Sequence, residues 1–214
     1  MTIYNDQINQ YISSLFAVED APLVSARQDS PKHGLPTINI TPEEGRFLQF
    51  LVRASGVRKA IEIGTLGGYS GSWIARGLLP GGKLITLDKE TRHAEVAQMH
   101  FAAAGLSEVI EVRIGDAHQL LTQLSAEGPF DFVFIDAEKP GYPAYFDWAL
   151  ENLRLGGIVA AHNAFRKGSV AGLAKDDENS ELMRQFNQQV ANESRLISTI
   201  YPAGDGTLIS VKIA

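Results

Sequence analysis

Two apolar segments of the chain each end in polar side chains that can bind or move a proton. The first leads into Asp136 and Lys139, and the second leads into His162 and Asn163. A lysine that is desolvated or lies near another cation has a lowered pKa and can accept a proton at neutral pH. A neutral imidazole can do the same near pH 7. The sequence therefore predicts proton-transfer chemistry at Lys139 or His162, beside the carboxylate of Asp136.

Each of these residues also has an ordinary structural explanation. A lysine before Pro-Gly in a loop is usually a solvated charge, Asp136 could cap the next helix, and His162 could simply form a hydrogen bond beside the pocket. The place of Lys139, three residues after an aspartate that ends a strand, favours the catalytic interpretation. Tyr142 is expected to pack the following helix onto the sheet.

A glycine-rich segment, KAIEIGTLGGYS at residues 59–70, predicts a binding site of the nucleotide type. An apolar strand runs into glycines that let the backbone turn and approach a ligand, and then into a helix start whose N–H groups can face polar ligand atoms. Twenty-four residues after Gly64, a second apolar segment ends at Asp88. In βαβ nucleotide sites that position carries the carboxylate that accepts the ribose hydroxyls. An ordinary strand-to-helix turn is the structural alternative.

The same segment disfavours a dinucleotide. Leu66 stands where G-x-G-x-x-G has its second glycine, which lets a pyrophosphate approach, so nicotinamide-dependent redox chemistry is a weaker alternative. Glu62 would repel a diphosphate but attract a cationic amino-acid group. S-adenosylmethionine has that combination of adenosine, sulfonium and amino acid, and is the predicted cofactor.

Composition limits the function further. The chain has 214 residues, a formal net charge of -6 and no cysteine. The acidic balance argues against general binding of nucleic acid, which needs clustered lysine and arginine. Without cysteine there is no disulfide framework, thiolate metal site or cysteine nucleophile, and a cytoplasmic protein is expected. The N-terminal residues lack a secretion signal, and no segment approaches membrane-spanning length.

Alternating apolar and amphipathic segments predict an α/β fold over a single domain, residues 1–214, with an N-terminal attachment (1–56) and a Rossmann-like core (57–214). In the attachment we expect a helix over 3–18, a loop over 21–40, and a helix that starts with a capping box at 41–44. The core is expected to be a doubly wound, mostly parallel sheet with helices on both faces and strands at 59–63, 83–87, 109–114, 131–135 and 157–161. The helices between and after these strands are expected at 69–78, 91–104, 117–125, 142–152 and 178–191. A hairpin at 196–213 predicts that the last strand is antiparallel.

At this level of detail the chain resembles the small cation-dependent class I O-methyltransferases, the family of catechol and caffeoyl-CoA O-methyltransferases. The resemblance covers nearly the whole chain and depends on four segments: EIGTLGGYS at 62–70, GDA at 115–117, VFIDAEKPGY at 133–142 and LRLGGIVAAHN at 153–163. It implies a Rossmann-like seven-stranded sheet with an antiparallel last strand, S-adenosylmethionine as methyl donor, and a vicinal aromatic diol as acceptor. It also implies a homodimer that binds neither nucleic acid nor membrane.

The resemblance also implies residue roles. Lys139 matches the general base. The positions that match cofactor contacts are Glu62, Gly64, Thr65, Gly68, Ser70, Asp88, Asp116, Ala117 and Asp136. Asp116 could contact the ring amino group of the cofactor or only cap the next helix. Asp136, position 162 and Asn163 match the ligands of a divalent cation.

His162 departs from the family pattern, which reads Ala-Asp-Asn where this chain reads Ala-His-Asn. Magnesium prefers oxygen ligands, whereas imidazole suits zinc, iron, nickel and copper. Three interpretations stay open: a retained site for Mg²⁺ or a softer metal, a metal-free enzyme in which His162 serves as acid/base or hydrogen-bond partner, and a non-catalytic protein that binds S-adenosylmethionine or its demethylated product.

Overall fold

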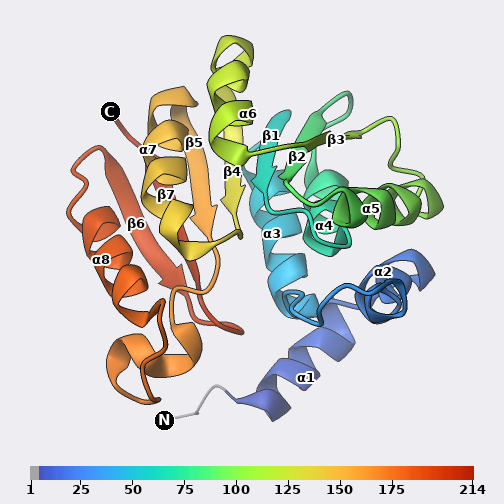
Figure 1. Ribbon diagram of the computed structural model, residues 1–214, viewed down its shortest axis with the longest axis horizontal. Coiled ribbons are helices and arrows are strands. Elements are labelled where there is room, and N and C mark those ends of the chain that lie inside the picture. Colours follow the sequence, from blue (N-terminus) through green and yellow to red (C-terminus); the bar gives the residue numbers. More distant parts are fainter. Residues whose placement is uncertain (1–4) are drawn as a thin grey trace. The chain divides into compact units, whose positions relative to one another are not determined.

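The computed structural model describes residues 5–214 and contains one seven-stranded sheet (Figure 1). The strand order is β3-β2-β1-β4-β5-β7-β6. The pairs β1–β4, β2–β3 and β4–β5 are parallel, whereas β7 is antiparallel to both β5 and β6. The predicted α/β sheet with an antiparallel last strand is therefore confirmed. The strands are β1 (Lys59–Ile63), β2 (Lys83–Asp88), β3 (Ile110–Ile114), β4 (Phe130–Ile135), β5 (Leu153–Ala161), β6 (Leu196–Tyr201) and β7 (Thr207–Lys212).

The helices of the core begin and end within two residues of the predicted bounds. The α-helices are α1 (Asp6–Phe16), α2 (Ala21–Gln28), α3 (Pro42–Ala54), α4 (Tyr69–Gly77), α5 (Thr91–Ala103), α6 (Ala117–Leu124), α7 (Tyr142–Asn152) and α8 (Ser180–Ala191). Short 3-10 helices are η1 (Ser30–His33), η2 (Ser125–Glu127), η3 (Lys139–Gly141) and η4 (Arg166–Ala171). None of the helices that the structure describes is long and apolar enough to span a membrane.

The N-terminal attachment contains more helix than predicted. The segment expected to be a loop over 21–40 begins with α2, so that part of the prediction is wrong. Asp20 caps this helix by accepting a hydrogen bond from the backbone N–H of Leu23 at 3.2 Å, and Pro22 lies in its first turn, where a proline is compatible with a helix. The helix expected over 3–18 is present as α1, and residues 3 and 4 lie outside the described residues.

The capping box at the start of α3 is confirmed. The backbone N–H of Glu44 donates to Oγ1 of Thr41 at 3.3 Å, and the backbone N–H of Thr41 donates to Oε2 of Glu44 at 2.8 Å. Each side chain therefore satisfies a backbone donor that the helix itself leaves unpaired.

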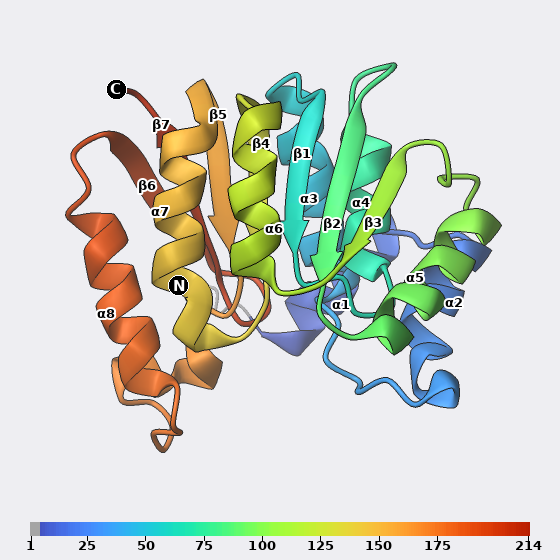
Figure 2. The same ribbon diagram turned by 45° about the horizontal axis from the view of Figure 1, so that its top comes forward.

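The chain divides into two compact units. The first comprises the chain up to Arg58 together with Thr65–Gly115, and the second comprises Lys59–Gly64 and Asp116–Ala214. The expectation of one domain with an attachment at 1–56 stays a prediction. In the second unit α7 lies along β4 and β5, and α8 lies beside β6 (Figure 2). The side chains predicted for proton transfer all belong to this second unit.

The centre of the second unit is apolar and fully closed to solvent. The four β4 residues Phe132 to Ile135 have an exposed fraction of 0%. Tyr142, Tyr145 and Phe146 of α7 are buried as well, and the packing expected of Tyr142 is therefore present. Such burial fixes the ends of β4 and β5, because neither strand can slide without exposing this core.

Candidate active site

Strand register brings Asp136 and His162 to the same edge of the sheet. Ile135, the last residue of β4, pairs with Ala161, the last residue of β5, and the two polar residues follow directly. The backbone N–H of His162 donates to the carbonyl of Ile135 at 3.0 Å, and that of Asp136 donates to the carbonyl of Ile63 at 2.9 Å. Both residues are thus held by ladder hydrogen bonds that continue the sheet by one residue.

The carboxylate of Asp136 lies between two nitrogen groups. Its Oδ2 is 3.2 Å from Nδ1 of His162, and its Oδ1 is 3.6 Å from Nζ of Lys139. The side chains of His162 and Lys139 are only 6% and 8% exposed. Burial alone would raise the pKa of Asp136, but the neighbouring His162 and Lys139 outweigh it and hold the pKa below its ordinary value. The carboxylate is therefore charged at neutral pH.

Lys139 is a buried amine and not a solvated surface charge. Its Nζ donates hydrogen bonds to the carbonyl of Ala137 at 2.9 Å and to the phenol oxygen of Tyr142 at 2.6 Å. Burial lowers the pKa of Lys139, and Asp136 opposes this shift without cancelling it. A lysine with a lowered pKa holds more of the neutral amine near pH 7, which is the form that accepts a proton.

Tyr142, for which the sequence predicts packing of the helix onto the sheet, is also part of this cluster. It starts α7 directly after η3, and its side chain is fully buried. The phenol donates a hydrogen bond to the backbone carbonyl of His162 at 3.2 Å while it accepts one from Lys139. Burial raises the pKa of Tyr142 well above 10, so the phenol keeps its proton. Its spacing of three residues from Lys139, across a turn started by Pro140, is the signal that could have revealed it.

Asn163 is held by Asp205, in the turn between β6 and β7. Nδ2 of Asn163 donates to Oδ2 of Asp205 at 2.9 Å, and the backbone N–H of Lys167 donates to Oδ1 at 2.5 Å. Asn163 has a φ of 61°, a left-handed conformation that asparagine tolerates better than most residues. Asp205 therefore orients the side chain of Asn163 and also binds the backbone at the start of the segment that follows Asn163.

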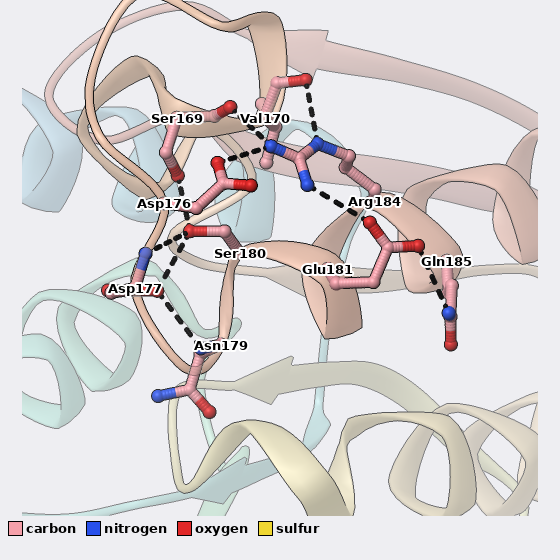
Figure 3. Close-up of polar contacts among 9 residues, drawn as sticks. All are labelled: Ser169, Val170, Asp176, Asp177, Asn179, Ser180, Glu181, Arg184 and Gln185. Atoms are coloured by element: carbon pink, nitrogen blue, oxygen red, sulfur yellow. Dashed lines mark hydrogen bonds and ion pairs between the residues drawn. The ribbon is translucent and has the colours of Figure 1, made fainter.

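That segment, residues 164–179, is held against α8 by hydrogen bonds and an ion pair (Figure 3). Arg184 donates to the backbone carbonyls of Ser169 at 2.8 Å and Val170 at 3.3 Å, and to the carboxylate of Asp176 at 2.5 Å. Ser180 Oγ lies 2.7 Å from the hydroxyl of Ser169. No local sequence pattern predicts that an arginine of the following helix organises this segment.

Gly64 sets the distance between the ends of β1 and β4. It has a φ of +100°, and a Cβ added there would collide with the backbone carbonyl of Asp136. The sequence argument expected the glycines to admit a ligand. At Gly68, which has a φ of +82° and precedes α4, an added Cβ would meet the ring of Phe101. Both positions thus require glycine for packing within the protein, whatever ligand they also face.

In the first unit Asp88 organises the glycine-rich loop. Its Oδ2 accepts hydrogen bonds from the backbone N–H groups of Thr65 at 3.1 Å and Leu66 at 3.0 Å. The hydroxyl of Thr65 also lies 2.6 Å from that of Thr86. Nδ1 of His93, a residue that the sequence argument did not single out, lies 3.1 Å from the same carboxylate oxygen. Asp88 thus lies at the end of β2 as predicted, and its contact to a ribose stays a prediction.

The remaining predicted cofactor residues lie on three different elements. Glu62 is fully buried in β1, and Ser70 lies in the first turn of α4. Asp116 caps α6, which begins at Ala117, and its Oδ1 accepts the N–H of Gln119 at 3.1 Å. The capping role of Asp116 is therefore present, and its contact to a cofactor ring stays a prediction.

The three predicted metal-ligating residues do not fit a magnesium site. They supply one carboxylate, one imidazole and one amide, whereas Mg²⁺ favours several oxygen ligands in octahedral geometry. Both oxygens of Asp136 already face nitrogen groups, and the amide of Asn163 is oriented by Asp205. Among residues 5–214 no three acidic or histidine side chains converge closely enough to hold a metal ion.

Comparison with known proteins gives a consistent result. The sequence profile of a family described as O-methyltransferase matches residues 13–213. A catechol O-methyltransferase of Niastella koreensis is 39% identical over 91% of this chain and 89% of its own length. A catechol O-methyltransferase of Mycobacterium tuberculosis is 36% identical over 94% of this chain and 87% of its own length. The crystal structure of an O-methyltransferase from Bacillus cereus in complex with SAH has a TM-score of 0.89 and 38% identity, with coverage of 96% of this chain and 97% of that one.

Proposed function

Since the chain belongs to the O-methyltransferase family, we propose that it transfers a methyl group from S-adenosylmethionine to a hydroxyl of a small, catechol-like aromatic acceptor. The observation that carries this proposal is the group formed by half-buried Asp136 with buried Lys139 and His162, which supplies a carboxylate and two candidate bases at one edge of the sheet. The names of two relatives, both catechol O-methyltransferases, support the acceptor class.

The choice of methyl donor has separate support. The solved relative from Bacillus cereus is in complex with SAH, the compound that remains when S-adenosylmethionine has given up its methyl group. When bound, S-adenosylmethionine supplies a methyl group already activated by its sulfonium. In this chain Asp88 lies where a ribose acid is expected, and Glu62 is a buried carboxylate of β1 that would attract a cationic amino-acid group.

The protein's own part is to orient the acceptor hydroxyl and remove its proton. The hydroxyl oxygen forms a bond to the methyl carbon, the carbon–sulfur bond breaks with its electron pair going to sulfur, and the phenolic proton passes to the protein. Neutral Lys139 can take this proton on Nζ. If His162 donates Nδ1–H to Asp136, its basic lone pair is on Nε2, and that nitrogen is the second candidate.

The decisive experiment measures turnover with catechol and S-adenosylmethionine and looks for methylated catechol and SAH in equal amounts. Lys139→Met should lower kcat by about 10²–10⁴-fold, the usual contribution of a general base. Lys32→Met removes an exposed lysine, 75% accessible and paired with Asp29 on the surface, and should leave kcat unchanged. Tight cofactor binding without methylation of any catechol-type acceptor would favour a non-catalytic binding protein and would contradict the proposal.

We also propose a cytoplasmic homodimer. The lack of cysteine agrees with a reducing compartment, and α1 carries exposed apolar side chains, Tyr11, Leu15 and Phe16, that a second copy could cover. Light scattering of the purified protein, compared with a Leu15→Glu and Phe16→Glu double variant, tests the oligomeric state.

A further inference from the structure

We propose that this site works without a divalent cation, because His162 and Lys139 take the two positions on Asp136 that a cation would need. The proposal concerns the site of the proposed function and rests on it for the turnover measurement only.

The first argument is geometric. Nδ1 of His162 faces one oxygen of Asp136 at 3.2 Å and Nζ of Lys139 faces the other at 3.6 Å. A cation bound to Asp136 would have to displace one of these groups. Neither group moves easily, because both are buried and Lys139 also donates to Tyr142 and to the carbonyl of Ala137.

The second argument is electrostatic. Asp136 is the one carboxylate of this trio, and its two oxygens already face Nζ of Lys139 and Nδ1 of His162. A divalent ion at the same carboxylate would lie close to Nζ of Lys139 and would repel the cation that forms when Lys139 accepts a proton. The nearby carboxylate of Asp205 does not supply a second negative charge for a cation, because it accepts hydrogen bonds from Asn163 and from the backbone of Lys167.

The third argument concerns what a cation would otherwise do. A bound cation would polarise an acceptor oxygen and favour loss of its proton. Here neutral Lys139 or Nε2 of His162 can remove that proton directly, and both groups lie beside Asp136. Side chains alone therefore supply the proton acceptor.

Metal content and metal binding test this inference directly. Purified protein dialysed against Mg²⁺, Mn²⁺ or Zn²⁺ is analysed by elemental mass spectrometry, and calorimetry follows each ion titrated into the metal-free protein. We expect elemental analysis to find less than one metal ion per protein chain, and calorimetry to show no saturable heat of binding. Turnover should be unchanged in excess EDTA. Stoichiometric metal in the wild type that is lost in Asp136→Asn would overturn the inference, whereas metal that persists in this variant lies elsewhere and leaves the inference standing.

Two substitutions at one position sharpen the result. His162→Asp adds a second carboxylate and should raise the affinity for Mg²⁺ by about tenfold or more, as ligand charge does at such sites. His162→Asn offers an oxygen without the charge and is the matched control, which should not gain affinity. Equal Mg²⁺ affinity in both variants and the wild type would contradict the claim that the identity of residue 162 decides cation binding.

Failure of the proposed function is distinguishable from failure of this inference. A protein that methylates no catechol-type acceptor contradicts the proposed function, and the elemental and calorimetric results still decide whether the site binds a cation. If His162→Asp does not fold, the wild-type and Asp136→Asn measurements decide the question alone.

Discussion

The phenol oxygen of Tyr142 lies 2.6 Å from Nζ of Lys139 and donates a hydrogen bond to the backbone carbonyl of His162. One buried hydroxyl thus joins the Lys139 amine to the backbone of the residue that carries the second candidate base. Because Nζ of Lys139 also lies 4.3 Å from the centre of the Tyr142 ring, the tyrosine restricts the amine from two directions.

Tyr142→Phe should therefore reduce kcat by roughly tenfold with little change in KM, as expected when a base loses its orientation but substrate contacts remain. The lost phenol oxygen accepts a hydrogen bond from the ammonium form, so its removal should lower the pKa of Lys139 further and shift the acidic limb of the kcat profile to lower pH. Steady-state kinetics between pH 5 and pH 9 check this. A shift of that limb to higher pH would contradict the assignment.

Lys139→Met should lose activity without losing stability. Because burial lowers the pKa of Lys139 in the folded protein, the charged amine destabilises the fold at neutral pH, and this effect fades as the pH rises through the folded pKa toward the ordinary value of 10.5. In urea at pH 7, the free energy of unfolding of the variant should be at most about 1 kcal/mol below that of the wild type, and it can exceed the wild-type value. The lost hydrogen bonds have a net value of about 1 kcal/mol, which sets this limit. Any excess in the unfolding free energy of the variant over that of the wild type should be smaller at pH 10. A variant that is less stable than the wild type at pH 7 but equally stable at pH 10 would contradict the lowered pKa of Lys139 in the folded protein.

Gly64→Ala should be strongly destabilising because the added Cβ would strike the carbonyl of Asp136. Gly81→Ala is the matched control: Gly81 also has a left-handed φ, of +78°, but an added Cβ there meets nothing within 4 Å. The control should lose about 1–2 kcal/mol for the backbone conformation alone. Gly64→Ala should lose clearly more and also reduce turnover. Equal losses in urea unfolding would show that the contact with Asp136 does not matter.

Arg184→Leu should loosen the segment of residues 164–179. The arginine donates to two backbone carbonyls of that segment and to Asp176, so its loss should accelerate amide hydrogen exchange there. Arg195→Leu is the control, because Arg195 pairs with Glu193 and Glu151 away from this segment. Faster exchange of residues 164–179 in the control, or none in Arg184→Leu, would contradict the assignment.

The order of core elements could be predicted from sequence because its signals are local and strong. The apolar segments before Asp88 and Asp136 read as buried strands, and the capping box at 41–44 marks a helix start that the structure contains. The helix at 21–28 was missed because Pro22 was read as a loop signal, although Asp20 before it is a good cap. The first residues of β5 were missed because two glycines, at 156 and 157, interrupt the apolar pattern.

Only those residues of the site whose positions follow from the ends of the strands could be predicted from the sequence. Asp136 and His162 follow paired strand ends, so their proximity follows from a parallel sheet. The contact between Asn163 and Asp205 joins residues 42 positions apart through a side chain in a hairpin turn, which no local pattern specifies. The Lys139–Tyr142 hydrogen bond likewise depends on how a short 3-10 turn directs two side chains.

The strand order has a consequence for biosynthesis. β7 is translated after every other strand, yet it lies between β5 and β6 and pairs with both. Until it emerges from the ribosome, the nascent chain presents an open edge on β5, the strand that leads into His162. Premature termination before Thr207 would therefore leave an aggregation-prone product rather than a merely shortened enzyme.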